Sequence, residues 1–156
     1  MRKGTAICLG PDIDTDLIIA GRYLRTKDRS VWAAHVFEDL DIELTDRLSG
    51  SVIVAGRNFG CGSSREQAPV ALKEAGVVAV ISPLFARIFF RNAINVGLPV
   101  LEANIASCKD GDEITIDLDR GILEIEDVGY SFTPLSPRMR DILDAGGLVP
   151  YWRGKG

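Results

Sequence analysis

Short runs rich in apolar residues alternate with longer segments of mixed polarity over the first two thirds of this chain. The runs at 3–9, 51–55, 77–81 and 98–101 have the composition of strands buried in a protein interior. Strands of this kind, separated by helices, are typical of a parallel sheet that is covered by helices.

Segments in which apolar residues recur at helical spacing separate these strands. A serine or a glycine marks their boundaries: Ser30 is placed to cap the first helix, and Gly76 and Gly97 follow the second and the third. The predicted helices are residues 31–38, 65–75 and 84–95.

The pattern changes after residue 112. Three short segments mix apolar and polar residues mostly in alternation, which predicts a half-exposed antiparallel meander. Its strands are expected at 113–118, 122–125 and 130–132, with turns at 119–121 and 127–129 and a final helix at 138–144. We therefore expect one α/β domain over residues 1–156, with a mainly parallel sheet flanked by helices and an added antiparallel β-layer.

Composition narrows the class of protein. A net charge of −4 without a basic stripe argues against nucleic-acid binding, and no apolar run approaches the roughly 20 residues that a membrane span needs. The N-terminal apolar stretch breaks at Gly10-Pro11, too early for a signal-peptide core, so a cytoplasmic location is expected. Cys8, Cys61 and Cys108 are far apart in sequence, so we expect no metal or iron–sulfur site from this chain alone.

The candidate functional groups lie in residues 58–66, whose sequence is Asn-Phe-Gly-Cys-Gly-Ser-Ser-Arg-Glu. It joins a predicted strand to a predicted helix, so its hydroxyls, backbone N–H groups and guanidinium are expected to face one point and to bind a small carboxylate or phosphate. The structural alternative is a capping box between Ser63 and Glu66, which stabilises a helix by about 1 kcal/mol. Glycine on both sides of Cys61, and Arg65 set against the helix dipole, favour the ligand.

Other functional motifs do not fit this segment. A Walker loop would need Gly-Lys-Ser/Thr, and a dinucleotide fingerprint would need Gly or Ala where Arg65 stands. The aspartates of residues 12–16 do not begin a calcium loop, because Leu17 and Tyr23 occupy the positions of its Gly and Glu. A serine hydrolase lacks a convincing triad, since His35 is the sole histidine.

Residues 58–68 resemble the characteristic motif of the small subunits of 3-isopropylmalate dehydratase and homoaconitase, which are similar to the mobile swivelling domain of aconitases. The resemblance extends to Asp14-Thr15-Asp16, to residues 21–26 and to residues 81–99. It covers nearly the whole chain, in order.

The resemblance implies a hydro-lyase that converts a 2-hydroxy acid to a 3-hydroxy acid by dehydration and rehydration, as in leucine biosynthesis. Its partner would be a large subunit that carries a [4Fe-4S] cluster, in a heterodimer or heterotetramer, with no cofactor on this chain. Ser63 would be the base that removes the proton, acting as an alkoxide. Ser64 and Arg65 would bind a substrate carboxylate, with Asp16, Cys61 and Gly62 in support.

Arg25 and Thr26 would meet the substrate side chain. An arginine there suits the distal carboxylate of a homocitrate-type substrate better than the isopropyl group of isopropylmalate. Both substrates remain open, as does a carboxylate-binding module without catalysis, and a solvated Arg25 is the structural alternative.

Four further residues invite a structural interpretation. Cys61 is either a thiol with a pKa lowered at a helix N-terminus or a packing residue. His35 is expected to pack within its helix, and Arg87 and Arg91 to pair with acids from one helix face.

Overall fold

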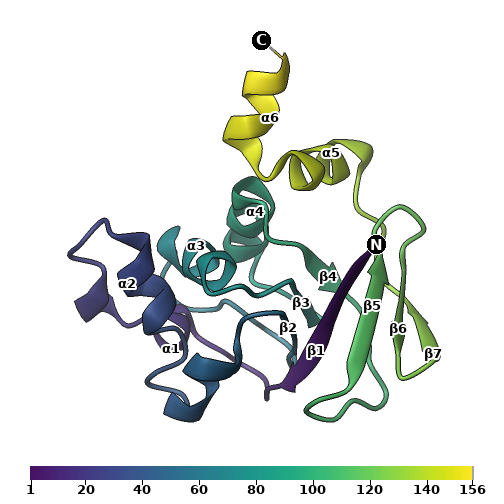
Figure 1. Cartoon of the computed structure of the whole chain (residues 1–156), viewed down its shortest axis with the longest axis horizontal. Coiled ribbons are helices and arrows are strands. Elements are labelled where there is room, and N and C mark those ends of the chain that lie inside the picture. The colour runs from purple at the N-terminus through teal and green to yellow at the C-terminus, as the bar shows by residue number, and fades with distance from the viewer. Residues whose placement is uncertain (156) are drawn as a thin grey trace.

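Parallel strands form one half of a seven-stranded sheet (Figure 1). The computed structural model describes residues 1–155, and its strand order is β4-β3-β2-β1-β5-β6-β7. Every residue of β2 and β3 is buried, as expected for strands covered on both faces. The parallel strands are β1 (Arg2–Cys8), β2 (Ser51–Val54), β3 (Ala79–Ser82) and β4 (Val100–Glu102).

The antiparallel meander continues the same sheet, because β5 pairs with β1. Its strands are β5 (Glu113–Asp117), β6 (Ile122–Ile125) and β7 (Val128–Ser131). Buried residues alternate along β5 and β6, so one face of the meander is solvated, as predicted. The turn predicted at 127–129 is wrong: Glu126 and Asp127, at φ 47° and 69°, form the two-residue connection, since tight hairpins need positive φ there.

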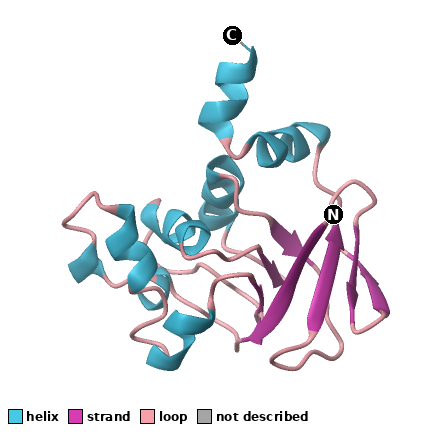
Figure 2. Cartoon of the chain, viewed as in Figure 1, coloured by secondary structure: helices cyan, strands magenta, loops and turns pink. Residues whose placement is uncertain are grey.

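Three of the predicted helices are present (Figure 2). They are α3 (Gln67–Glu74), α4 (Arg87–Val96) and α5 (Pro137–Ala145). Gly97 and Gly146 end α4 and α5 in the left-handed conformation, at φ 86° and 90°. A further helix, α6 (Leu148–Lys155), was not predicted; it contacts α4 and α5 and projects away from the sheet (Figure 1).

Two short α-helices, α1 (Thr15–Ile18) and α2 (Arg29–Ala34), lie between β1 and β2. Two 3₁₀-helices, η1 (Gly21–Tyr23) and η2 (Ile42–Arg47), lie in the same part of the chain. The prediction for α2 was wrong at both ends. Asp28 rather than Ser30 caps it, because the Asp28 side chain accepts the N–H of Ser30 at 3.0 Å and so starts the helix at Arg29. The helix stops at Ala34 because the chain turns at Phe37, which has φ 62°.

The parallel direction of β1, β2 and β3 brings the segments that follow them to one edge of the sheet. Ser82, at the end of β3, fixes two of these segments: its hydroxyl bonds the Gly56 carbonyl at 2.8 Å and accepts the Leu84 N–H at 3.2 Å. Ligands bind at this edge in open α/β sheets, which makes it the place to look for a site. No helix within residues 1–155 is long and apolar enough to cross a membrane.

Candidate active site

The glycine–serine segment, residues 58–66, is held between the segments that follow β1 and β3. The Gly60 N–H donates to the Ile13 carbonyl at 2.8 Å, and the Thr15 N–H donates to the Cys61 carbonyl at 2.9 Å. On the other side the Ala86 N–H donates to the Phe59 carbonyl at 3.0 Å. Three loops that are distant in sequence therefore form one rigid unit.

Packing within the protein explains both glycines of this segment. Gly60 and Gly62 have φ of 83° and 87°, which side chains rarely adopt. A Cβ at Gly60 would lie 2.3 Å from the Phe89 ring, and one at Gly62 would lie 2.3 Å from an Asp14 carboxylate oxygen. Packing alone therefore requires glycine at both positions, so the inference from these glycines to a ligand was wrong, although both residues do line the cleft described below.

The predicted capping box is also wrong. Helix α3 begins at Gln67, and its N-cap residue, Glu66, makes no side-chain cap. Ser63 lies earlier, on an exposed loop, where its carbonyl accepts a 2.8 Å hydrogen bond from the hydroxyl of Thr15. This tertiary bond holds Ser63 in a loop conformation, and the helix begins only at Gln67.

Several backbone N–H groups of this loop have no hydrogen-bond partner within residues 1–155. Within residues 1–155, the N–H groups of residues 63–66 make no backbone hydrogen bond. No hydrogen bond holds the Ser63 or Ser64 hydroxyl within that range either. These donors are free to receive an anion, although they do not belong to the first turn of α3 as we expected.

Arg65 is the most constrained residue of the segment. Its guanidinium lies 2.6 Å from an Asp16 carboxylate oxygen, and its side chain is 25% exposed. The Nε atom is buried without a hydrogen-bond partner among residues 1–155, and a Cβ placed on Gly21 would lie 3.0 Å from Nη1. Asp16 thus contacts the serine segment through Arg65.

A cleft of about 350 Å³ opens beside these residues, within the size range of small-molecule sites. Three of the predicted residues, Gly62, Ser64 and Arg65, line it. The cleft does not include Ser63, Cys61, Asp16, Arg25 or Thr26 in its lining. The other lining residues are Thr15, Gly60, Ala86, Arg87, Ile88, Phe89 and Asn92.

Two lining residues of α4, Arg87 and Asn92, were missed as site residues. The pairing expected for Arg87 and Arg91 is wrong, since neither forms an ion pair within the described chain. Arg87 is the first residue of α4 and is exposed at the cleft. A cation at that end of a helix opposes the dipole, and the reasoning applied to Arg65 would have found it.

The loop of residues 21–28 begins against Arg65, through Gly21. The Thr26 hydroxyl accepts the Asp28 N–H at 3.1 Å, so it keeps its own hydrogen as a donor. Arg25 is exposed and Thr26 is half-buried. Arg25 forms no ion pair within residues 1–155.

The cysteines differ from expectation. Burial raises the pKa of the Cys61 thiol, with Asp14 and Asp12 adding to it, so of the two interpretations considered for Cys61 the lowered pKa is wrong. The Cys8 and Cys108 thiols, distant in sequence, lie within hydrogen-bonding reach, and burial raises the pKa of Cys108 to about 12. Among residues 1–155 no three Cys, His, Asp or Glu residues are placed to hold a metal ion.

Comparison with known proteins gives one family. The model of the aconitase C-terminal domain matches residues 12–104, which include the whole cleft. The 3-isopropylmalate dehydratase small subunit of Sulfurimonas denitrificans is 52% identical over 146 residues, covering 91% of this chain and 87% of that protein. The methanogen homoaconitase small subunit of Methanothermobacter thermautotrophicus is also 52% identical, over 153 residues, covering 96% of this chain and 89% of that one.

A solved structure agrees with the fold. The crystal structure of 3-isopropylmalate dehydratase from Methanocaldococcus jannaschii superposes with a TM-score of 0.92 at 48% sequence identity. The match covers 98% of this chain and 93% of that one. The predicted α/β class is confirmed.

Proposed function

Because this chain belongs to the aconitase C-terminal domain family, as a relative of dehydratase small subunits, we propose that it is one half of a heteromeric hydro-lyase. The enzyme isomerises a 2-hydroxy acid to a 3-hydroxy acid by dehydration and rehydration, with 3-isopropylmalate dehydratase as the leading activity. Residues 1–156 act in it as one swivelling domain.

The observation that carries this proposal is the cationic cleft beside the serine segment. Ser64 and Arg65 line it, and Arg87 supplies a second guanidinium without an ion pair in the described chain. Guanidinium groups bind carboxylates through paired, charge-assisted hydrogen bonds. Asp16 holds one terminal nitrogen of the Arg65 guanidinium, and the Nε atom of that group is buried without a hydrogen-bond partner within residues 1–155.

Ser63 is the proposed base. Its exposed hydroxyl carries no hydrogen bond within residues 1–155 and can approach a substrate carbon from the loop. An alkoxide is costly in water, and it is favoured where backbone N–H groups and cations are already oriented. The open N–H groups of residues 63–66 and the nearby Arg65 provide that environment.

The rest of the active site belongs to a large subunit. The described part of this chain has no cluster of metal-ligating side chains, so its residues do not fit an iron–sulfur cluster. We assign the [4Fe-4S] cluster to the partner, where it would supply a Lewis acid for the substrate hydroxyl. The small subunit contributes the base and the carboxylate site.

A specific observation favours a second candidate, the homoaconitase-type reaction on tricarboxylates. Arg25 has no ion pair within residues 1–155, so its guanidinium is available to a distal carboxylate. A relative 52% identical to this chain is named as a methanogen homoaconitase small subunit. The choice between the two substrates rests on this loop.

The test is reconstitution with an iron–sulfur large subunit, followed by assays with isopropylmalate, citraconate and homoaconitate. We expect turnover of at least one, and loss of about 10²- to 10⁴-fold in kcat for Ser63→Ala, as for removal of a general base. The matched control is Ser131→Ala, an exposed serine on β7, with circular dichroism and gel filtration to verify fold and assembly. Near-normal turnover by Ser63→Ala in an intact complex would reject Ser63 as the base.

A further inference from the structure

The loop of residues 21–28 is anchored at its carbonyls by Trp32. The indole N–H of Trp32 donates to the carbonyls of Tyr23 and Thr26, at 3.1 and 3.2 Å. Trp32 is 8% exposed, so these bonds are partly shielded from water. They bracket Leu24 and Arg25 and fix the two ends of the short segment between them.

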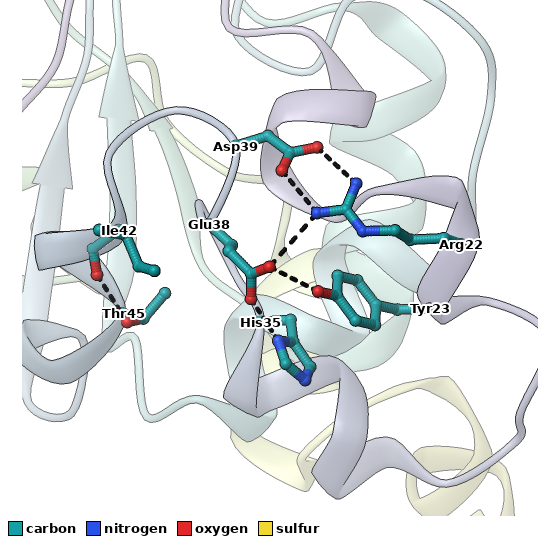
Figure 3. Close-up of polar contacts among 7 residues, drawn as sticks. All are labelled: Arg22, Tyr23, His35, Glu38, Asp39, Ile42 and Thr45. Atoms are coloured by element: carbon teal, nitrogen blue, oxygen red, sulfur yellow. Dashed lines mark hydrogen bonds and ion pairs between the residues drawn. The ribbon is translucent and has the colours of Figure 1, made fainter.

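A second anchor holds the side chains of the same loop (Figure 3). One carboxylate oxygen of Glu38 accepts from the Tyr23 hydroxyl at 2.5 Å and from Arg22 at 3.3 Å, and the other bonds the His35 ring. The Tyr23 ring stacks on His35 with centroids 3.9 Å apart. Glu38 is thus the shared acceptor of three side chains.

The neighbouring carboxylate reinforces this anchor. Asp39 binds both terminal nitrogens of Arg22, at 2.7 and 3.0 Å, and the guanidinium lies over the Tyr23 ring, 4.8 Å from its centroid. Consecutive residues 38 and 39 therefore bind consecutive residues 22 and 23. Such paired contacts fix the direction of the loop as well as its position.

Backbone strain marks the point from which both carboxylates extend. Phe37 has φ 62°, a conformation that is unusual for a bulky residue, and its side chain is fully buried. Its N–H donates to the Ile18 carbonyl at 2.9 Å, which ties this turn to α1. The strained turn ends α2 early and points Glu38 toward Tyr23 (Figure 3).

We propose that Glu38 is a positioning residue that sets the substrate preference of the enzyme by fixing the loop of Arg25 and Thr26. The inference rests on the proposed function, which assigns Arg25 to the distal end of the substrate. Glu38 acts through Tyr23 and Arg22, which lie two and three residues before Arg25, and it does not line the cleft itself.

The first test needs no activity. Arg22, Arg25 and Lys27 are trypsin sites within the loop, so release of the loop is measured as cleavage of the native chain. We expect Glu38→Gln to be cleaved there at least about fivefold faster, as for loss of one hydrogen bond to a charged group. Glu43→Gln, the same change at an exposed residue nearby, is the control and should match the wild type. Unchanged cleavage of Glu38→Gln would overturn the proposal.

The second test uses the reconstituted enzyme. Glu38→Gln should change the ratio of kcat/KM for homoaconitate to that for isopropylmalate by about fivefold or more, mainly through KM. Equal losses on both substrates, together with a lower Tm, would indicate a structural role only and would reject the inference. Tyr23→Phe, which keeps the stacked ring, should shift the ratio in the same direction and should not add to Glu38→Gln in the double variant.

The two proposals fail in different ways. No turnover of either substrate by the wild-type complex would reject the proposed function, while the cleavage test would still decide whether Glu38 holds the loop. Turnover with an unchanged substrate ratio in both variants would reject the role of Glu38 and leave the function standing.

Discussion

The guanidinium of Arg65 lies 2.6 Å from the carboxylate of Asp16, and this ion pair joins the loops that follow β2 and β1. The two side chains differ in exposure to solvent: that of Arg65 is 25% exposed and that of Asp16 is 58% exposed. An exposed ion pair contributes at most about 1 kcal/mol to stability. Its effect is therefore expected in the orientation of Arg65 rather than in the stability of the fold.

Asp16→Asn should separate these two effects. We expect kcat/KM of the reconstituted enzyme to fall about tenfold or more, because Arg65 loses the charged hydrogen bond that orients it. The free energy of unfolding should change by less than about 1 kcal/mol. Asp119→Asn, which breaks a similarly exposed pair with Arg140, is the control and should leave kcat/KM unchanged. A kcat/KM for Asp16→Asn equal to that of the wild type would refute the orienting role.

Gly21→Ala tests the contact between the Arg25 loop and the cleft. The new Cβ would lie 3.0 Å from Nη1 of Arg65, so the guanidinium must shift although Asp16 holds it. We expect a higher KM with little loss of stability, measured by steady-state kinetics and urea unfolding. Gly129→Ala, where a Cβ meets open space, should change neither. Kinetics that match between the two variants would show that Arg65 tolerates the displacement.

Gly62→Ala should destabilise the protein for two reasons. The residue has φ 87°, and its Cβ would collide with Asp14 at 2.3 Å. Gly50→Ala isolates the effect of backbone conformation, since Gly50 has φ 76° but a Cβ there would meet open space. We expect that variant to lose about 1 kcal/mol of the free energy of unfolding. Urea unfolding should show a larger loss for Gly62→Ala than for Gly50→Ala. Equal losses would mean that Asp14 moves aside without cost.

The alkylation of Cys108 should report its raised pKa. Burial and the neighbouring Cys8 thiol raise that pKa to about 12, so little reactive thiolate forms near neutral pH. Peptide mass spectrometry after iodoacetamide treatment should show slower labelling of Cys108 in the native chain than in urea at pH 8. Labelling of Cys108 in the native chain at the rate seen in urea would contradict this.

Acid should weaken the anchor of the Arg25 loop. The Tyr23 hydroxyl, with His35 and Arg22, holds the pKa of Glu38 below its ordinary value of 4.5. The unfolded chain therefore takes up the proton first, and the stabilisation is present above about pH 4.5 and lost as the pH falls through the folded pKa. Urea midpoints measured below that pH should fall more steeply for the wild type than for Glu38→Gln. Parallel profiles would exclude a contribution from Glu38.

The sequence was sufficient for the strands and for most of the helices. Continuous apolar runs fixed β2 and β3, and Gly97 located the end of α4. Two of the errors lie where a distant contact decides local structure. Phe37 ends α2 through a turn tied to Ile18, and the Thr15 hydroxyl keeps Ser63 out of α3. Neither bond has a local pattern that a sequence argument can detect.

The candidate site was predicted in part, for the same reason. Ser64 and Arg65 carried a local signal and line the cleft as a pair. The partner of Arg65, the contact with Gly21 and the position of Arg87 depend on three loops meeting at one sheet edge. The role of Glu38 depends on four side chains from two turns, and helical spacing gave no indication of it.

The place of the Asp14 carboxylate, against the α-carbon of Gly62, has a consequence for engineering. The glycine–serine segment cannot keep its conformation as a linear motif alone. Its backbone conformation depends on contacts with residues 12–16 on one side and with Phe89 on the other. Residues 58–66 moved alone into an unrelated scaffold would lose the contacts that give the segment its shape. A functional graft would have to carry all three segments together.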